Sequence, residues 1–373
     1  MAAQIKSDQR IARLTPLPEV LAYIESRVKP VAPKQYSASA ACGLVLAEDV
    51  RVSHPLPAHA IALRDGYAVD SELTRDATSY APATLFAAHC VNAGETMPPD
   101  TDAILPQDAV TRLGATAATL SPATTGDGVL ATGGDAGPGT VLFRSGRMLR
   151  NSDIAVLCAA DVASVAVRTP RIAILRATSR SDNILEAAVT LLTRAVGAAG
   201  GQIASGDGDH FESALGRDEF DAAIAVGGTG TGQGDKAVTT LAQVGEVAFH
   251  GIAVAPGDTA GIGFVAHRPV LLIPGRLDAA LTCWLLLGEA LLNRLSGRLP
   301  EQSVRLARLT RKVASSLGLT ELIPVTCKDE EVEPLASNYL PLQVIARADG
   351  WISVPAESEG YPAGSRVTVR PLP

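Results

Sequence analysis

The feature that most constrains the fold is an alternation of apolar strands and amphipathic helices between residues 171 and 300. Residues 171–175 read Arg-Ile-Ala-Ile-Leu, the pattern of a buried strand, and residues 183–196 carry apolar side chains at helical spacing. Further strands are expected at residues 200–204, 220–226 and 269–273, followed by a helix over residues 278–295. This alternation predicts a three-layer α/β domain with a mostly parallel sheet.

The flanking regions have a different character. A helix is expected near Val20, Ile24 and Val28, a second short helix over residues 38–46, and a helix followed by a strand over residues 151–168. Short apolar pieces separated by Gly, Pro and Asp predict a β-rich insertion over residues 51–145. A small β domain is expected after residue 300, with strands at residues 304–312, 342–347, 350–354 and 366–370.

Composition excludes several classes of protein. The chain has 373 residues, of which 47% are hydrophobic and 19% charged, as in a folded protein of several domains. The formal net charge of −7 argues against a general nucleic-acid or anionic-membrane surface. Residues 1–13 show no signal peptide, and the longest apolar stretch, residues 279–292, is too short and too polar to span a bilayer. Five scattered cysteines suggest reduced, buried thiols in a cytoplasmic protein, without a disulfide framework or a zinc motif.

The strongest candidate site is a glycine-rich loop between a predicted strand and a predicted helix. It reads Gly227-Gly228-Thr229-Gly230-Thr231-Gly232-Gln233-Gly234-Asp235. In open parallel sheets ligands bind beyond the carboxyl ends of the strands, where glycine-loop N–H groups and a helix N-terminus attract phosphate. Asp235 could hold Mg²⁺, although the loop matches neither a Walker A motif nor a dinucleotide fingerprint. The alternative is a flexible turn with Asp235 as a helix cap.

Two further loops occupy similar positions. Pro274-Gly275-Arg276 follows a strand, and Arg276 could pair with a phosphate, or else stay solvated with Asp278 as a helix cap. Asp258, in a turn between strands, is a candidate metal or ligand contact, with a solvated turn residue as the alternative.

The remaining motifs carry less information. Asp65 and Gly66 form a turn signal before a strand residue, Tyr67, so a structural role is the simpler interpretation. The six histidines show no zinc-binding spacing. No Gly-x-Ser-x-Gly nucleophile elbow is present, so acyl-transfer chemistry has no support.

These motifs, in this order, resemble the molybdopterin molybdenumtransferase family of the MoeA and gephyrin E-domain type. The similarity runs from about Pro16 to Val369. Each motif alone is weak, and the resemblance rests on their common order. The matching pieces are Leu46-Ala47-Glu48-Asp49-Val50, Asp65-Gly66-Tyr67-Ala68-Val69, Asp102-Ala103-Ile104, Gly133-Gly134-Asp135, Arg171-Ile172-Ala173-Ile174-Leu175, the loop from Gly227 to Asp235, Pro256-Gly257, Pro274-Gly275 and Gly364-Ser365-Arg366-Val367.

The resemblance implies a fold, a ligand and partners. It implies an elongated chain of four domains: residues 14–50 with 146–169, residues 51–145, residues 170–300 and residues 301–373. It also implies a homodimer whose active cleft lies between the α/β domain of one subunit and the first two domains of the other. Such proteins bind adenylylated molybdopterin and, with Mg²⁺ and molybdate, release AMP and insert molybdenum into the dithiolene. A non-catalytic protein of this fold could instead hand a bound molybdopterin-type cofactor to a client molybdoenzyme.

Departures from the family pattern cluster at the expected site. Where the family has Thr-Gly-Asp-Glu, this chain has Ala177-Thr178-Ser179-Arg180, without the two carboxylates. Lys-Pro-Gly-Lys-Pro becomes Ala255-Pro256-Gly257-Asp258-Thr259, and Pro-Gly-Asn-Pro becomes Pro274-Gly275-Arg276-Leu277. Gly-Glu-Asp becomes Gly133-Gly134-Asp135, without the glutamate. In the motif around Asp65 the first acidic residue of the family pattern is absent, and only the second, Asp65, remains. The loss of two lysines makes the pocket less attractive to oxyanions, with Arg180 and Arg276 as possible replacements.

Two functions follow from this pattern. The first is a divergent molybdenumtransferase in which Asp235, Asp135 and Asp65 are the catalytic candidates, Asp235 and Asp258 the metal candidates. Its ligand-binding candidates are Gly227, Gly228, Thr229, Gly230, Thr231, Gly232, Pro274, Gly275, Arg276 and Arg180. The second is a non-catalytic protein of the same fold that binds or delivers a molybdopterin-type cofactor. A scaffold without a ligand is a third, weaker alternative, because a scaffold has no use for so many loop glycines.

Overall fold

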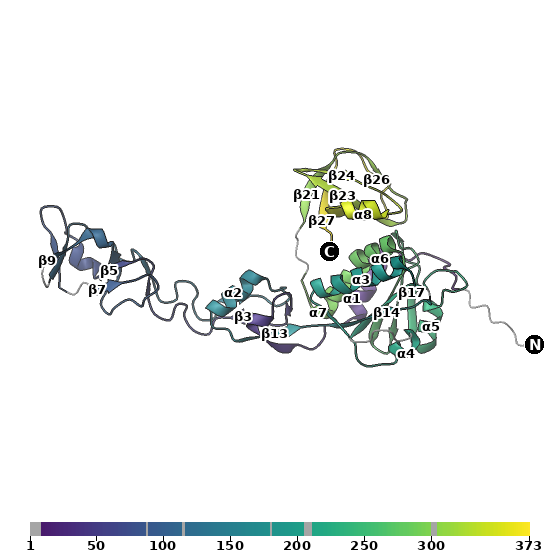
Figure 1. Ribbon diagram of the computed structural model, residues 1–373, viewed down its shortest axis with the longest axis horizontal. Coiled ribbons are helices and arrows are strands. Elements are labelled where there is room, and N and C mark those ends of the chain that lie inside the picture. The colour runs from purple at the N-terminus through teal and green to yellow at the C-terminus, as the bar shows by residue number, and fades with distance from the viewer. Residues whose placement is uncertain (1–8, 87–88, 114–115, 180, 205–210, 300–303) are drawn as a thin grey trace, which may run out of the picture. The chain divides into compact units, whose positions relative to one another are not determined.

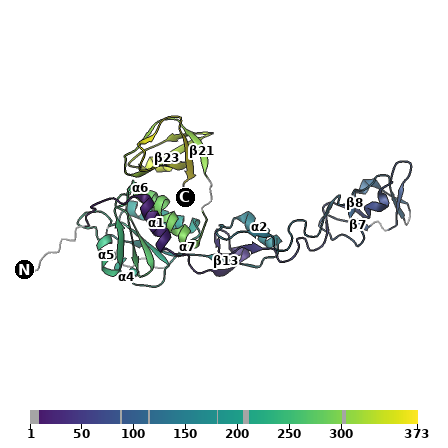
Figure 2. The same cartoon turned by 180° about the vertical axis from the view of Figure 1, so that it is seen from behind.

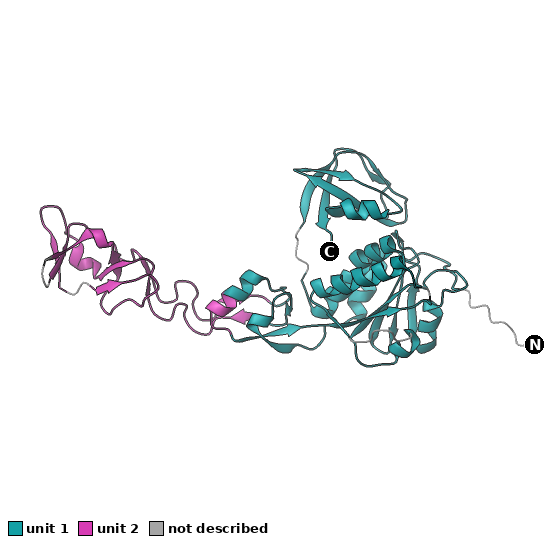
Figure 3. Cartoon of the chain, in the orientation of Figure 1, with its two compact units in different colours: residues 1–48, 145–155, 163–373 teal, residues 49–144, 156–162 magenta. Residues whose placement is uncertain are grey.

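The computed structural model describes residues 9–86, 89–113, 116–179, 181–204, 211–299 and 304–373. The chain forms two compact units (Figure 3). The first takes residues 1–48, 145–155 and 163–373, and the second takes residues 49–144 and 156–162. Among the described residues, no helix is both long and apolar enough to cross a membrane.

A six-stranded sheet forms the centre of the first unit. Four strands are parallel, as predicted, and two antiparallel strands extend one edge. The sequence pattern missed β19 because its glycines read as a turn; a Cβ at Gly263 would lie 2.1 Å from the Glu246 carbonyl oxygen of the neighbouring strand. The order across the sheet is β15 (Gln202–Ile203), β14 (Arg171–Arg176), β16 (Ala222–Val226), β20 (Arg268–Ile273), β19 (Gly261–Val265) and β17 (Glu246–His250).

Helices cover both faces of this sheet, which confirms the three-layer prediction (Figures 1 and 2). One face packs against α1 (Leu17–Arg27), α3 (Asn183–Ala198), α6 (Leu277–Cys283) and α7 (Glu289–Ser296). The other packs against α4 (Phe211–Leu215) and α5 (Ala237–Val244). The single helix expected over residues 278–295 contains a π-helical turn, η4 (Trp284–Gly288), between α6 and α7.

A smaller sheet of the first unit joins segments far apart in sequence. It consists of β1 (Lys34–Ser37), β13 (Ser164–Arg168) and β2 (Val45–Leu46). The short helix expected over residues 38–46 is wrong, because only Ala38–Ala40 (η1) is helical and β2 pairs with β13. The helix expected before β13 is confirmed as α2 (Asn151–Ala159), whose residues are divided between the two units.

The C-terminal region of the first unit is a small, barrel-like β domain. Pairing of β23 with both β24 and β25 closes its main sheet. The strand expected over residues 342–347 is wrong: this segment is the helix α8 (Leu342–Arg347), with Pro341 at its N-cap and Ile345 packed on the core. The strands are β18 (Val254–Ala255), β23 (Thr320–Lys328), β24 (Glu331–Pro334), β21 (Arg305–Leu309), β27 (Arg366–Pro371), β25 (Gly350–Val354), and the pair β22 (Val313–Ala314) and β26 (Gly360–Tyr361).

The second unit is rich in short strands, as the sequence predicts. Its described residues form two three-stranded sheets and two strand pairs, with the short 3₁₀ turns η2 (Ser71–Thr74) and η3 (Gln107–Ala109). The sheets are β7 (His89–Val91), β5 (Gly66–Val69) and β8 (Ala103–Leu105), and β6 (Ala83–Leu85), β10 (Thr116–Thr119) and β9 (Val110–Leu113). The pairs are β4 (Ile61–Ala62) with β11 (Val129–Leu130), and β3 (Val50–Arg51) with β12 (Val141–Phe143).

The cysteines depart from the expectation of buried thiols. All five are free, but only Cys283 is buried, whereas Cys42, Cys90 and Cys158 are exposed. Burial raises the pKa of the Cys283 thiol, which keeps it protonated and unreactive.

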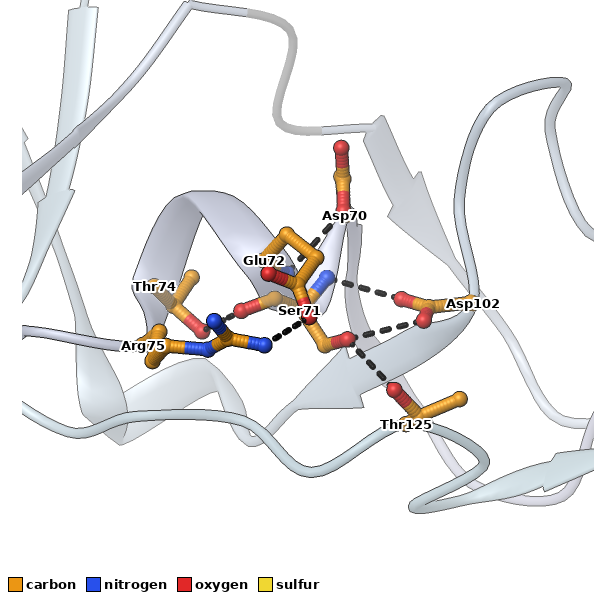
Figure 4. Close-up of polar contacts among 7 residues, drawn as sticks. All are labelled: Asp70, Ser71, Glu72, Thr74, Arg75, Asp102 and Thr125. Atoms are coloured by element: carbon orange, nitrogen blue, oxygen red, sulfur yellow. Dashed lines mark hydrogen bonds and ion pairs between the residues drawn. The ribbon is translucent and has the colours of Figure 1, made fainter.

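A polar cluster ties η2 to the start of β8 (Figure 4). The Asp102 carboxylate accepts hydrogen bonds from the Ser71 backbone N–H at 2.7 Å and the Ser71 hydroxyl at 2.8 Å. The Ser71 hydroxyl also lies 2.8 Å from the Thr125 hydroxyl. Partial burial raises the pKa of Asp102, but hydrogen bonds from Ser71 and Thr125 outweigh it, so the pKa is lowered.

This cluster predicts an acid-sensitive contribution to stability. Because the pKa of Asp102 is lowered on folding, its contribution is complete above the ordinary carboxyl pKa of about 4 and is lost as the pH falls through the lowered value. We expect Asp102→Asn to destabilise the protein by about 1–3 kcal/mol at pH 6, and by much less near pH 2. Urea unfolding of both proteins across this range measures the difference. An equal difference at both pH values would contradict the prediction.

Candidate functional site

A cavity of about 410 Å³ lies where β14, β16 and β20 end, at the edge of the sheet where the sequence places the three loops. It lies within the first unit. The predicted residues Gly227, Gly228, Thr229, Gly230, Asp235, Pro274, Gly275 and Arg276 line it, together with Thr178, Asp182, Ile184, Leu185 and Thr259.

The glycine loop turns sharply as it leaves β16. Gly227 and Gly228 have φ angles of +88° and +66°, which side chains rarely tolerate. A Cβ at Gly228 would lie 2.2 Å from the Ala177 carbonyl oxygen, so the loop packs directly on the neighbouring backbone. Within the part of the chain that the structure describes, the backbone N–H groups of Gly228, Thr229 and Gly230 have no acceptor. Successive N–H groups of this kind form an anion-binding concavity.

The N-terminus of α5 does not contribute donors to this cavity, contrary to the sequence expectation. The Ala237 N–H donates to the Gly228 carbonyl oxygen. The Val238 and Thr239 N–H groups donate to Oε1 of Gln9, at 2.8 and 3.2 Å. Lys236, rather than Asp235, is the N-cap residue. The phosphate-binding capacity of the loop therefore rests on its own N–H groups.

Thr229 is fixed from two sides. Its carbonyl oxygen lies 2.9 Å from His250 Nε2, and its hydroxyl lies 3.0 Å from the hydroxyl of Thr259. Thr229 is only 2% exposed, so the two contacts hold a buried residue. They connect the glycine loop to β17 and to the turn that carries Asp258.

Arg276 is oriented by an acidic partner. Its guanidinium donates to both carboxylate oxygens of Asp278, which is 3% exposed, and lies 5.2 Å from the centre of the Tyr339 ring. The hydrogen bond from Arg276 to Asp278 is the main cause of the raised pKa of Arg276. Asp278 lies inside the first turn of α6, where Arg276 is the N-cap residue, so the expected cap at Asp278 is wrong by two residues.

The carboxylates at the cavity differ in environment. Asp235 Oδ2 accepts the Gly232 N–H at 3.0 Å, which closes the loop on itself. Asp182 lines the cavity and caps α3 through the N–H groups of Ile184 and Leu185. Asp258 is exposed and lies outside the cavity lining, although its charge acts on Arg276. No cluster of three or more His, Cys, Asp or Glu suited to a metal ion occurs among the described residues.

Other predicted residues lie apart from this cavity lining. Thr231 and Gly232 belong to the exposed part of the loop, and Arg180 lies outside the described residues. Asp65 and Asp135 belong to the second unit, where both are exposed; Asp65 accepts the Ala93 N–H at 2.8 Å. Their catalytic role stays a prediction.

Sequence reasoning missed several residues of the cavity and its supports. Asp182 lies two positions after the segment that lacks the family carboxylates, and its acidic side chain before a helix was a detectable signal. Gln9 and His250 gave no such signal, because their partners lie far away in sequence. Only the tertiary structure brings them to the loop.

Family models match the chain in three consecutive stretches. The MoeA N-terminal region (domain I and II) matches residues 15–160. The model described as "Probable molybdopterin binding domain" matches residues 180–294, a range that includes the cavity loops. The MoeA C-terminal region (domain IV) matches residues 306–372.

Individual relatives agree with this order of domains. Molybdopterin molybdenumtransferase 2 of Mycobacterium tuberculosis is 26% identical over 88% of this chain and 92% of its own length. A Methanocaldococcus jannaschii protein, named provisionally for molybdopterin biosynthesis, is 31% identical, but the match spans only 40% of this chain and 36% of that protein. The crystal structure of a molybdopterin biosynthesis MoeA protein from Pyrococcus horikosii matches 97% of this chain and 100% of its own, with a TM-score of 0.77 and 25% identity. The chain belongs to the MoeA-type molybdopterin molybdenumtransferase family, whose members act in molybdenum cofactor biosynthesis.

Proposed function

We propose that this chain binds adenylylated molybdopterin in the cavity and inserts molybdenum from molybdate, with release of AMP. The observation that carries the proposal is the row of backbone N–H groups at Gly228, Thr229 and Gly230, which have no acceptor among the described residues. Such groups are costly to leave without a partner in a buried loop and are suited to the oxygens of a phosphate. We propose further that the chain forms a homodimer, is located in the cytoplasm and has a client molybdoenzyme as a partner.

The residues of the cavity divide the work of binding. Loop N–H groups would hold the phosphates, with Thr178 and Thr259 at the cavity wall as further hydroxyl donors. Arg276, fixed by Asp278, would contact an anionic part of the ligand from the β20 side. A ligand held at several fixed points is oriented for attack at the phosphate and at the dithiolene.

The donor set fits Mg²⁺ held jointly with the ligand. Mg²⁺ typically takes one or two protein carboxylates and completes its shell with phosphate oxygens and water. Asp235 and Asp182 are the carboxylates of the cavity lining, and we propose them as its protein ligands. The exposed Asp258 could take part only as an outer contact. When bound, Mg²⁺ would neutralise phosphate charge.

A carrier without catalysis is the second candidate. It is favoured by Asp258 and Arg276, which stand where the family pattern has lysine and asparagine, and by the engagement of Arg276 with Asp278. In that case the cavity would bind the pterin ligand without releasing AMP.

The experiment is an assay of AMP release by the purified chain from adenylylated molybdopterin, with and without molybdate and Mg²⁺. We expect molybdate-dependent AMP release that requires Mg²⁺. Asp235→Asn should raise the Mg²⁺ concentration needed for AMP release and remove most of the activity, because it takes a negative charge away from the metal site. Asp329→Asn, an exposed turn residue with a φ of 51° that asparagine tolerates, is the matched control.

Each outcome separates the candidates. Binding of the substrate without AMP release would support the carrier. No binding of the substrate would reject both functions. AMP release by Asp235→Asn with an unchanged dependence on Mg²⁺ would remove Asp235 from the metal site while leaving the proposed reaction in place.

A further inference from the structure

The N-terminal segment before α1 reaches the glycine loop. Gln9 is only 6% exposed, although it lies in a polar stretch of sequence. Its Nε2 donates to the carbonyl oxygens of Gly228 at 3.1 Å and Gly230 at 2.8 Å. Its Oε1 accepts the first free N–H groups of α5, from Val238 and Thr239. One side chain thus binds both the loop and the helix that follows it.

The segment is anchored at a second point. Thr15 pairs with Ile252, with its N–H donating to the Gly251 carbonyl oxygen at 2.9 Å and its carbonyl oxygen accepting the Ala253 N–H at 2.8 Å. A Cβ at Gly251 would lie 2.4 Å from Ile11 Cγ2, so the segment packs closely over this glycine. Because both ends of the residue 9–15 segment are held, Gln9 is delivered to the loop in a fixed position.

The Gln9 contacts determine which groups of the loop remain available to a ligand. The carbonyl oxygens of Gly228 and Gly230 both accept hydrogen bonds from the Gln9 amide. A peptide whose carbonyl is fixed has a fixed plane, so the N–H of the next residue has a fixed direction. The N–H groups of Thr229 and Thr231 follow those two carbonyls directly.

We propose that Gln9 is a positioning residue for the ligand-binding loop: its amide sets the orientation of the Gly228 and Gly230 peptides and caps α5. The residue therefore determines the affinity of the loop for a phosphate-bearing ligand without touching the ligand. This inference rests on the proposed function only where it predicts a change in ligand affinity. The geometry of the loop can be tested without any ligand.

The test compares three variants with the parent chain. Gln9→Met keeps the length of the side chain and removes all four hydrogen bonds. Gln9→Glu keeps an acceptor for the α5 N–H groups but removes the amide donor and sets a carboxylate against two carbonyl oxygens. Gln243→Met, at an exposed position of the same α5, is the matched control.

Two readouts are measured on each protein. Hydrogen exchange followed by mass spectrometry reports separately on the loop, residues 227–235, and on α5. Calorimetry with AMP reports the affinity for a phosphate ligand. For Gln9→Met we expect faster exchange in both segments and an AMP Kd raised about tenfold, the equivalent of one to two net hydrogen bonds.

Gln9→Glu gives the decisive contrast. We expect it to restore slow exchange in α5 but not in the loop, and to leave the AMP Kd raised. A purely structural loss would move both segments together. Exchange and AMP affinity equal to the parent in Gln9→Met would overturn the inference. If the parent itself does not bind AMP while loop exchange responds to Gln9 as expected, the positioning role stands and the proposed function fails.

Discussion

Replacement of Gly228 by alanine is expected to remove ligand binding and to destabilise the protein by more than about 3 kcal/mol. The φ of +66° alone costs an alanine about 1–2 kcal/mol. The added Cβ would also lie 2.2 Å from the Ala177 carbonyl oxygen, a backbone atom that cannot move aside without disturbing β14. The loop would have to leave the cavity.

Urea unfolding and AMP calorimetry measure the two effects of Gly228→Ala. The control is Gly234→Ala in the same loop, where φ is not positive and an added Cβ meets no atom within 4 Å. We expect Gly234→Ala to change stability by less than about 0.5 kcal/mol. Equal stability of the two variants would show that the tight contact at Gly228 relaxes freely and would contradict the prediction.

Asp278→Ala is expected to be the most destabilising change among the acidic residues of the cavity region. Asp278 is 3% exposed and accepts hydrogen bonds from Arg276, from the Ala279 N–H at 2.8 Å and from the Leu340 N–H at 3.4 Å. Its loss leaves buried donors without partners and detaches the Leu340 segment of the β domain from α6. Removal of one partner from a buried ion pair costs about 3–5 kcal/mol. Because the Arg276 side chain is largely exposed, we expect Asp278→Ala to cost an amount near the lower end of this range.

Thermal and urea unfolding of Asp278→Ala measure this cost. Glu19→Ala is the control, because Glu19 is an exposed acidic residue in the first turn of another helix, α1. Its loss should cost less than about 1 kcal/mol, the size of a helix-dipole effect. Asp278→Asn should fall between the two, since it keeps an acceptor oxygen and loses the charge. A stability of Asp278→Ala within 1 kcal/mol of the control would refute the assignment of Asp278 as a structural anchor.

The contrast between Gly228 and Gln9 shows what sequence could predict about the site. Gly228 lies in a glycine-rich run directly after a buried strand, a local pattern that places a phosphate loop at the sheet edge. The cavity accordingly forms around this loop and around Pro274-Gly275-Arg276. Gln9 contacts the same loop from 219 residues away. No local pattern carries that information, because its cause is the path of the chain after folding.

The errors in the fold have a similar origin. Residues 342–347 read Leu-Gln-Val-Ile-Ala-Arg, and their β-branched Val344 and Ile345 are typical of a strand. Pro341 at the N-cap and the packing of Ile345 on the core nevertheless favour the helix α8. The strand β19 was missed because its glycines read as a turn, whereas they allow close approach of β17. Tertiary packing outweighed local preference in both places.

The sequence by itself determined the layered α/β domain, the β-rich insertion and the loops that meet at the cavity, because hydrophobic period and glycine placement act locally. Only the tertiary structure decided which groups of those loops remain open to a ligand. The N-terminus of α5 is closed by Gln9, Arg276 is held by Asp278, and the N–H groups of Gly228 to Gly230 have no acceptor in the described chain. Hydrogen bonds form between groups that lie close together in space, and a local sequence pattern does not contain the distances between residues far apart in the chain.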